Sequence, residues 1–327
     1  MYLITGGAGF IGSNIAAVLA DRGDDVVISD WLGSDERWRN LAKHTYMDIV
    51  APPALKSWLE ENGSALSAVI HMGAISATTE TNIDALLESN IRLSLDLWDF
   101  CARKEVALIY ASSAATYGDG RQGFDDQQDE KTLSTLAPLN AYGWSKHFVD
   151  RRISRLLAQG APKPPQWIGL KFFNVYGPNE YHKGGMKSVI AQNFAKVRAG
   201  ETLRLFRSRH PGYVDGGQLR DFIYVKDCVN VILWLLSRPE ISGLFNLGTG
   251  VARSWLDLAH GLFAALGLEP NIAFIDMPQN IQEKYQYFTQ ARMDRLRRAG
   301  YDTPFLGLER GIREYVQHYL DTGDPYA

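Results

Sequence analysis

Short apolar runs alternate with longer amphipathic stretches along the first half of the chain. Buried strands are predicted at 1–5, 25–30, 68–71, 107–112 and 167–173. Between them apolar residues recur three and four positions apart, which predicts helices at 13–22, 53–61, 81–101 and 141–157. Such alternation is typical of a parallel sheet covered by helices on both faces.

The pattern changes after Asn174. Loops rich in glycine are predicted at 175–185 and 208–219. Further helices are predicted at 186–199, 226–236 and 254–266, and further strands at 203–206, 220–225, 243–247 and 272–276. We predict an α/β fold: a doubly wound parallel sheet with a second, smaller α/β lobe built from discontinuous segments. The larger lobe would comprise 1–174 and about 220–250, and the smaller lobe 175–219 and about 251–327.

Closely spaced glycines separate the first predicted strand from the first helix. Gly6 allows a tight turn, Gly9 lets the backbone approach a pyrophosphate, and Gly12 lets the helix pack on the strand. The N-terminus of that helix would offer free N–H groups to the phosphates. Asp30 ends the second predicted strand, where an acid binds a ribose 2′-hydroxyl. The pattern predicts that the larger lobe binds a dinucleotide.

The same region leaves the type of nicotinamide cofactor open. Asp30 suits the free ribose of NAD and repels a 2′-phosphate. Arg37, Arg39 and Lys43 follow closely and could outweigh that repulsion. We favour NADP, with NAD as the alternative.

A tyrosine and a lysine four residues apart are the central candidates for chemistry. Tyr142 and Lys146 would share one face of a helix. A phenol has a pKa of about 10, and a nearby cation would lower it so that Tyr142 can act as a base. Ser112 and Ser113 end a predicted strand, where a hydroxyl can hydrogen-bond a reacting oxygen. His71 also ends a strand, and we interpret it as a hydrogen-bonded structural histidine.

Composition argues against several other classes of function. The 327 residues carry a formal net charge of −3, which gives no reason to expect nucleic acid or a membrane as the partner. Cys101 and Cys228 lie in apolar helical stretches, which predicts buried free thiols, and no metal site is expected from the cysteine and histidine spacing. Since no leader sequence or long apolar run is visible, we expect a cytoplasmic protein.

Several motifs resemble the extended short-chain dehydrogenase/reductase family of nucleotide-sugar epimerases and dehydratases, over essentially the whole chain. They are TGGAGFIG at 5–12, SSAATYG at 112–118, YxxxK at 142–146, FFNVYGP at 172–178, RDFIYVKD at 220–227 and FNLGTG at 245–250. Four further stretches resemble the branch that epimerises ADP-heptose. They are HMGAISATTE at 71–80, GPNEYHKGGM at 177–186, KYQYFTQ at 284–290 and LRRAGY at 296–301.

The resemblance implies an isomerase that inverts C6 of ADP-D-glycero-D-manno-heptose through a 6-keto intermediate, using bound NADP, in the synthesis of a lipopolysaccharide core precursor. It also implies a homo-oligomer. One acid/base residue would serve one epimer poorly, because the carbonyl must turn between oxidation and reduction. The resemblance assigns the two proton transfers to Tyr142 and Lys183, ribose binding to Lys146, and oxygen binding to Ser113, with Ser112 as the alternative. Lys183 would need a lowered pKa, which we expect from burial near cationic groups.

The resemblance also implies two sets of binding residues. Cofactor contacts, besides the three glycines, are implied for Phe10, Ile11, Asp30, Trp31, Arg37, Met72, Gly73, Ala74, Ile75, Ser76, Asn90, Lys146 and Val175. Contacts to ADP-heptose are implied for Asn174, Gly185, Gln192, Phe206, Arg207, Ser208, Arg209, Arg220 and Tyr285. Arg220 is the best diphosphate ligand, because its planar guanidinium can bond two oxygens. A salt bridge with Asp221 or Asp227 is the alternative for Arg220.

Two departures from the family pattern bear on the substrate. The loop at 207–218 is longer than the pattern, and Gly185 stands where serine is common. The first alternative function is an epimerase, dehydratase or reductase acting on another nucleotide sugar. Dehydratases usually carry an acid beside the strand-end serine, whereas Ala114 and Ala115 stand here. The second alternative is a non-catalytic NADP-binding protein. Such a protein should have lost the tyrosine or the lysine, whereas Tyr142 and Lys146 are both present.

Overall fold

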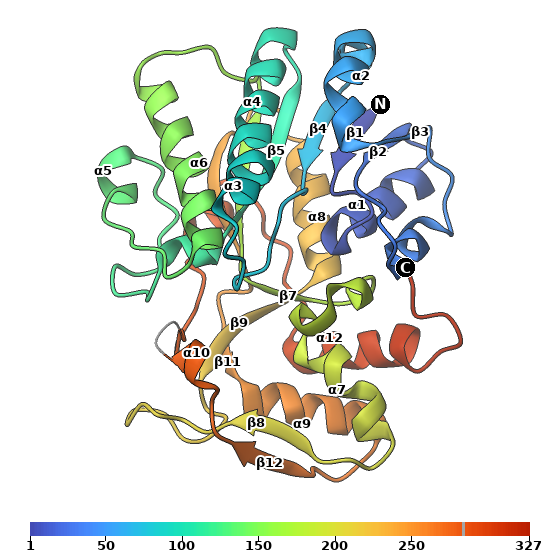
Figure 1. Ribbon diagram of the computed structural model, residues 1–327, viewed down its shortest axis with the longest axis vertical. Coiled ribbons are helices and arrows are strands. Elements are labelled where there is room, and N and C mark those ends of the chain that lie inside the picture. The colour runs from blue at the N-terminus through green and yellow to red at the C-terminus, as the bar shows by residue number, and fades with distance from the viewer. Residues whose placement is uncertain (283–284) are drawn as a thin grey trace.

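A seven-stranded parallel sheet forms the centre of the larger part of the molecule (Figure 1). The computed structural model describes residues 1–282 and 285–327. The strand order is β10-β6-β5-β4-β1-β2-β3, so the chain runs outward from β1 first on one side and then on the other. The strands are β1 (Tyr2–Thr5), β2 (Val26–Ser29), β3 (Asp48–Val50), β4 (Ala68–His71), β5 (Ala107–Ser113), β6 (Trp167–Phe172) and β10 (Gly243–Leu247).

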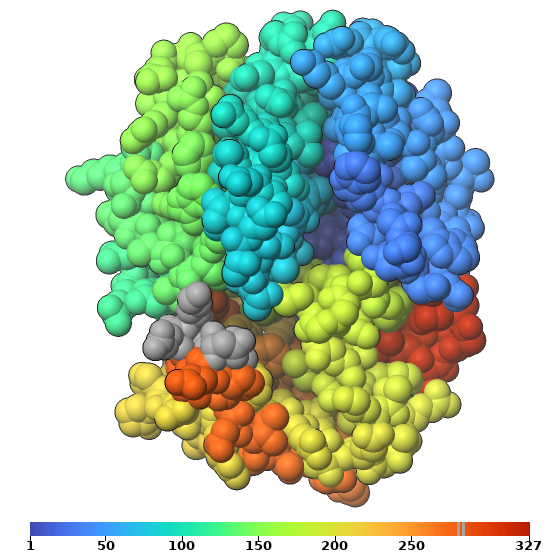
Figure 2. Space-filling view, in the orientation of Figure 1, coloured from blue at the N-terminus to red at the C-terminus, as the bar shows by residue number. Residues whose placement is uncertain are grey.

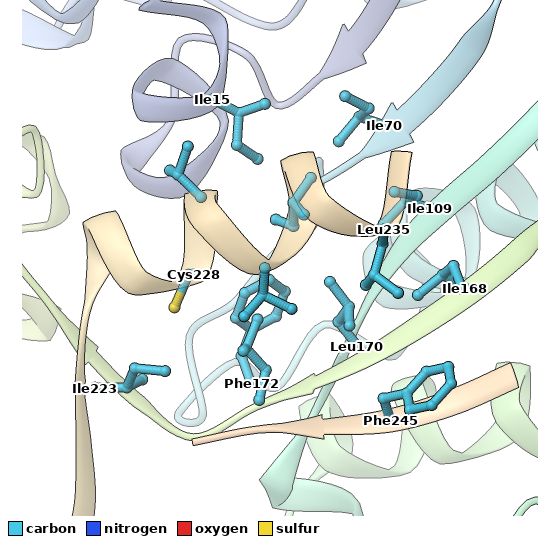
Figure 3. Close-up of a cluster of buried hydrophobic side chains, with 14 of the residues drawn as sticks. Ile15, Ile70, Ile109, Ile168, Leu170, Phe172, Ile223, Cys228, Leu235 and Phe245 are labelled. Atoms are coloured by element: carbon cyan, nitrogen blue, oxygen red, sulfur yellow. The ribbon is translucent and has the colours of Figure 1, made fainter. Parts of the chain in front are cut away.

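Helices cover both faces of this sheet, because its strands are apolar on both sides. One face packs against α1 (Phe10–Asp21) and α8 (Val225–Leu236), and Figure 3 shows Ile15 of α1 and Cys228 and Leu235 of α8 beside strand residues. The other face packs against α2 (Leu55–Asn62), α4 (Leu93–Lys104) and α6 (Ala141–Ala158). The predicted doubly wound α/β fold is confirmed.

A smaller α/β part lies beyond the carboxyl ends of the strands (Figure 1). It holds a three-stranded sheet and a two-stranded sheet, with three helices that share a separate apolar core. The elements are β7 (Asn174–Tyr176), β9 (Leu219–Tyr224), β11 (Ala252–Ser254), β8 (Leu203–Phe206), β12 (Ile272–Ile275), α7 (Val189–Arg198), α9 (Trp255–Leu266) and α12 (Leu308–Tyr315). Phe10 at the start of α1 belongs to this second core and so ties it to the glycine turn.

Short helices connect these elements. They are η1 (Glu36–Leu41), η2 (Pro52–Ala54), η3 (Gly63–Ala65), α3 (Ile83–Leu86), η4 (Leu87–Arg92), η5 (Ala114–Tyr117), α5 (Glu130–Leu133), η6 (Tyr181–Met186), α10 (Gln279–Gln282), α11 (Asp294–Arg298) and η7 (Val316–Leu320). No helix in the ranges given above is long and apolar enough to cross a membrane.

The structure departs from the expected elements in a few places. The helix expected at 81–101 is interrupted by a π-helical turn, η4, before α4 continues it. Strands β3, β7 and β11 were not predicted, because three residues are too few to show a period of two. The division into two lobes stays a prediction. Strand β10 extends the large sheet, whereas β9 pairs with β7 and β11 in the smaller one.

Candidate functional site

A cavity of about 480 Å³ lies over the carboxyl ends of the parallel strands. Figure 2 shows a hollow where the blue N-terminal part, the cyan part that follows β4 and the yellow-green part near η6 meet. Twenty-four residues line the cavity: Gly6, Gly9, Phe10, Ile11, Gly12, Asp30, Arg37, Met72, Gly73, Ala74, Ile75, Ser76, Ala77, Ala111, Ser112, Ser113, Tyr142, Lys146, Phe172, Phe173, Val175, His182, Lys183 and Met186. The structure thus gathers all four predicted catalytic residues in one place.

The glycine turn packs backbone against backbone too closely for side chains at Gly6 and Gly12. Gly6 has a φ of +66°, and a Cβ there would lie 2.5 Å from the backbone nitrogen of Gly73. A Cβ on Gly12 would lie 2.1 Å from the carbonyl oxygen of Gly6. Gly9 is the N-cap of α1, so the first N–H groups of the helix begin at this turn. These features fit a dinucleotide pyrophosphate, as the sequence predicted.

Asp30 is turned back toward the glycine turn. Its Oδ2 accepts the Ala8 N–H at 3.0 Å and its Oδ1 accepts the Trp31 N–H at 2.8 Å. Burial raises the pKa of Asp30, and these bonds together with Arg37 oppose the rise. Arg37 Nη1 lies 3.9 Å from Asp30 Oδ1, while its other nitrogens bond Asp35 and hold the pKa of Asp35 at about 2.

Two predicted cofactor residues do not line the cavity. Trp31 is 61% exposed, on the outer side of the site. Asn90 is fully buried in the π-helical turn, where its side chain bonds both the N–H and the carbonyl of Ile75, at 2.9 and 3.0 Å. Asn90 Nδ2 also donates to Ser145 Oγ at 3.0 Å. Asn90 therefore braces the 72–76 segment against the helix that carries Tyr142.

His71 is a structural histidine, as predicted. Its Nδ1 lies 2.6 Å from Thr5 Oγ1 and its Nε2 lies 2.9 Å from Ser94 Oγ. Burial, and to a lesser extent the charge of Lys146, lower its pKa to about 3, so the ring is neutral at physiological pH. The two hydroxyl contacts join the end of β4 to the end of β1 and to α4.

Ser113, Tyr142 and Lys146 meet at the end of β5 and the start of α6. Asn140 caps α6 through a 2.8 Å bond from the Gly143 N–H, which fixes the first turn that carries Tyr142. Burial lowers the pKa of Lys146 to about 8, and the carboxylate of Asp150 opposes that fall. Burial raises the pKa of Tyr142, and a hydrogen bond with Ser113 opposes the rise. The expected lowering of the tyrosine pKa by the lysine is therefore wrong here, because burial is the larger effect.

The two strand-end serines have different partners. Ser112 Oγ donates to Asp150 Oδ2 at 2.7 Å, inside the protein. Ser113 faces Tyr142 in the cavity and acts to lower its pKa, and Ser113 Oγ accepts the Ala115 N–H at 3.1 Å. This geometry favours Ser113 as the serine that meets a reacting oxygen.

Lys183 reaches the same cavity from η6. Its Nζ lies 5.2 Å from the centre of the Phe10 ring, at the start of α1. Burial lowers the pKa of Lys183, as expected. The neighbouring charge, however, is that of Glu180, which raises this pKa. Burial alone, and not a cationic neighbour, therefore favours the neutral amine.

Glu180 is a functional candidate that the sequence did not single out. It is fully buried, and it accepts the N–H and the hydroxyl of Ser188 at 2.5 and 2.6 Å and the Tyr315 hydroxyl at 3.2 Å. It thereby fixes both ends of the Lys183 loop to α12. Its place three residues before Lys183 in the GPNEYHKGGM motif is the signal that could have pointed to it.

Two polar side chains, those of Asn14 and Asn40, dock the start of the same loop on the glycine turn. Asn14 Nδ2 donates to the carbonyls of Phe10 and Pro178 at 2.9 and 3.0 Å. Asn40 Nδ2 donates to the Ala8 carbonyl at 2.8 Å, and it lies 3.3 Å from His182 Nδ1. These bonds place Lys183 relative to the dinucleotide motif.

The nine predicted substrate residues lie in the described part of the chain, and none lines the 480 Å³ cavity. One group surrounds the Lys183 loop, where Gln192 Nε2 bonds the carbonyls of Gly185 and Lys187 at 3.0 and 2.6 Å, and Asn174 begins β7. The other group is at the end of β8 and in the loop after it, and consists of Phe206, Arg207, Ser208 and Arg209, with Arg220 and Tyr285. Their role in substrate binding stays a prediction.

Arg220 is buried and forms no salt bridge with Asp221 or Asp227, which was the alternative to diphosphate binding. Its guanidinium lies over the rings of Tyr285 and Trp255, 5.0 and 5.8 Å from their centres. It donates to the carbonyls of Leu219 and Gln286. Asp221 instead accepts the N–H groups of Thr249, Gly250 and Ala291, and Asp227 that of Leu306, so the alternative of a pair with Arg220 is wrong.

The loop after β8 packs on the segment that follows α10. His210 and Tyr213 stack on Tyr287, with ring centres 5.2 and 5.5 Å away, and Tyr287 packs edge-on against Tyr285. Arg209 Nη1 donates to Gln282 Oε1 at 2.7 Å. Of the KYQYFTQ motif, Lys284 lies outside the described residues. The long loop thus packs on Tyr287, which in turn packs on Tyr285 beside Arg220.

Comparison with known proteins agrees with this geometry. Residues 2–248 match the model of the NAD dependent epimerase/dehydratase family. A protein of Nitratidesulfovibrio vulgaris named ADP-L-glycero-D-manno-heptose-6-epimerase is 49% identical over the full length of both chains. The crystal structure of the Helicobacter pylori enzyme of that name is 29% identical with a TM-score of 0.78, and the match covers 97% of this chain and 95% of that one.

A second similar solved structure contains a bound cofactor. The UDP-glucose 4-epimerase of Thermus thermophilus, in complex with NAD, is 25% identical with a TM-score of 0.75, and the match covers 97% of this chain and 98% of that one. The glycine turn, the Ser113–Tyr142–Lys146 cluster and these likenesses lead to one conclusion. The chain belongs to the NAD dependent epimerase/dehydratase family.

Proposed function

We propose that the chain inverts C6 of ADP-D-glycero-D-manno-heptose. The observation that carries the proposal is that Tyr142 and Lys183, from different elements, line one cavity beside the glycine turn. The full-length relatives named as heptose epimerases support the choice of sugar. Ala114 and Ala115 after the strand-end serine support an epimerase rather than a dehydratase.

The reaction makes a ketone of the C6 alcohol and reduces it from the other side. A bound nicotinamide cofactor would supply the hydride chemistry, the removal of hydride from C6 and its return. Ser113 and Tyr142 hold the reacting oxygen, and one of Tyr142 and Lys183 takes the hydroxyl proton as the ketone forms. The other returns a proton to the carbonyl oxygen after the C6 group has turned. Each epimer is thus served by its own acid/base residue.

The protein prepares both groups for this exchange. Burial lowers the pKa of Lys183 and so favours the neutral amine, the form that can accept a proton. The ammonium of Lys146 lies one helical turn from Tyr142 and would stabilise a phenolate as it forms. Both residues are enclosed by the cavity wall, which strengthens their interactions with the reacting oxygen.

We infer that NADP is the resident cofactor. The support is that Arg37 lines the cavity beside Asp30 and partly neutralises its charge. The oxygens of Asp30 are already engaged by the Ala8 and Trp31 N–H groups, which reduces their repulsion of a 2′-phosphate. Mass spectrometry of the nucleotide released by denaturing the purified protein should find NADP, and NAD in its place would contradict this inference. Arg37→Gln should weaken NADP binding about 10-fold or more while affecting NAD little.

The substrate assay tests the function directly. Purified protein without added cofactor should convert ADP-D-glycero-D-manno-heptose into a mixture of both C6 epimers, with no net change in absorbance at the nicotinamide band. Conversion of a UDP- or dTDP-sugar, with none of the ADP-heptose, would replace this function by that of another nucleotide-sugar enzyme. Analytical ultracentrifugation of the same sample should show a homo-oligomer, which the resemblance implies.

A further inference from the structure

A buried ion pair lies beneath the Ser113–Tyr142–Lys146 cluster. Lys171 on β6 and Asp150 on α6 have no exposed side-chain surface, and Lys171 Nζ lies 2.8 Å from Asp150 Oδ2. Lys171 Nζ also donates to Thr116 Oγ1 at 2.6 Å and lies 4.8 Å from the centre of the Tyr117 ring. Burying two charges is costly unless each is fully bonded, so such a pair is weak as a device for stability alone.

The carboxylate of Asp150 is held from three sides. Besides Lys171, it accepts the Ser112 hydroxyl at 2.7 Å and the Tyr110 hydroxyl at 3.3 Å. Ser112 is next to Ser113, and Asp150 follows Lys146 by four residues on the same helix. Residues four apart lie one above the other on a helix, so the carboxylate is held one turn from the Lys146 side chain.

The other titratable groups around Lys146 and Asp150 carry no charge near neutral pH. Burial lowers the pKa of His71 to about 3 and that of His147 to about 4. Burial likewise raises the pKa values of Tyr110, Tyr117 and Tyr142. Among the described residues, the charge that acts on Lys146 is therefore that of Asp150.

We propose that Asp150 is a positioning residue whose charge keeps Lys146 protonated, and that Lys171 holds the carboxylate in place for this purpose. The proposal rests on the proposed function, in which Lys146 acts as an ammonium beside Tyr142. Burial works in the opposite direction and lowers the pKa of Lys146 to about 8, which is close enough to neutrality for the charge to be lost easily. Asp150 thus sets the alkaline limit of activity without touching substrate or cofactor.

The test removes the charge of Asp150 and measures Lys146 directly. Asp150→Asn leaves the ammonium of Lys171 buried and unpaired, which can unfold the protein, so the double variant Asp150→Asn/Lys171→Met removes both charges together. Protein labelled with 13C at the lysine ε-carbons, with its resident cofactor, is titrated by NMR, and the Lys146 signal is assigned with Lys146→Arg. The pKa of Lys146 should fall by about 1 unit or more in the double variant.

Activity should follow the same titration. An ammonium is lost as pH rises through its pKa, so a lower pKa moves the alkaline limb of the rate profile to lower pH by the same amount. Glu130→Gln is the matched control, because it removes a carboxylate that pairs with Arg151 on the exposed side of α6. It should change neither the pKa of Lys146 nor the alkaline limb of the rate profile. A folded double variant with the wild-type Lys146 pKa would overturn the proposal. Failure of the wild type to epimerise ADP-heptose would instead overturn the proposed function, since the NMR titration is independent of turnover.

Discussion

Tyr142 and Lys183 differ in how the protein has prepared them. The phenol of Tyr142 is held in its neutral form by burial, and its hydrogen bond with Ser113 works against that. The amine of Lys183 is driven toward its neutral form by the same effect, with Glu180 working against it. Burial thus favours the neutral form of both groups, in which the phenol can donate a proton and the amine can accept one. This suits a reaction that moves a proton off one oxygen position and onto another.

Removal of the phenolic oxygen should stop proton transfer and leave the fold intact. In Tyr142→Phe we expect epimerisation to slow by about 100- to 10,000-fold, the range of general acid–base catalysis. Initial rates measure the loss of epimerisation. The melting temperature and the content of bound cofactor show whether the fold and the cofactor site are intact. Tyr213→Phe removes a hydroxyl from the loop after β8 and serves as the matched control. A Tyr142→Phe enzyme that keeps more than a tenth of wild-type activity would refute the assignment.

Loss of the amine of Lys183 tests the second proton carrier. In Lys183→Met we expect turnover to fall by about 100-fold or more, because one epimer then lacks its acid/base residue. Lys187→Met, on the same loop but outside the cavity lining, should retain wild-type turnover. The wild-type rate should fall as pH drops through the lowered pKa of Lys183, since protonation removes the base. If Lys183→Met were as active as Lys187→Met, the two-residue mechanism would be wrong.

At the scale of elements, the Lys183 loop is rigid because other parts of the chain hold it. Asn14 and Asn40 dock its start on the glycine turn, and Glu180 joins its two ends to α12. None of these contacts follows from the local propensity of 177–186. The C-terminal helix α12 thereby takes part in placing a proposed catalytic residue, although it lies outside the cavity lining.

Glu180→Gln should loosen this loop more than it destabilises the protein. An amide nitrogen cannot accept from Ser188, so the variant loses at least one buried hydrogen bond, at a cost of about 1–3 kcal/mol. We expect faster amide hydrogen exchange across 177–188 and a lower turnover number, with unchanged exchange in β1 and α1. Glu314→Gln, on α12, breaks a partly exposed pair with Lys226 of α8 and is the control. Unchanged exchange in the loop of Glu180→Gln would contradict its anchoring role.

For the whole molecule, the sequence was sufficient to predict the architecture and most of the cavity wall. The alternating apolar runs and the glycine turn predicted the doubly wound sheet, which is confirmed, and the motifs predicted the family, which the relatives confirm. Fourteen of the sixteen cofactor residues named from the sequence line the cavity. Asn90 does not, because the π-helical turn directs it into the protein as a brace.

The remaining features depend on contacts between distant segments. Glu180 and Tyr315 are 135 residues apart in the sequence, and Asp150 and Lys171 lie on different elements, α6 and β6. No local sequence pattern therefore reveals either pair. The sequence does not reveal what sets the pKa values of Lys183 and Tyr142 for the same reason. Burial is the larger effect on both, and burial is a property of the folded molecule. The site is thus assembled by tertiary packing from motifs that are each visible alone.

The central claim is that hydrogen taken from C6 of the sugar returns to the same carbon from the other side. The most direct measurement uses ADP-heptose carrying deuterium at C6, mixed with unlabelled substrate, in ordinary water and without added cofactor. We predict that both epimers keep the deuterium at C6 and that none appears in the solvent. Loss of the deuterium to water, with hydrogen in its place at C6, would show that the carbon is deprotonated instead and would contradict the account.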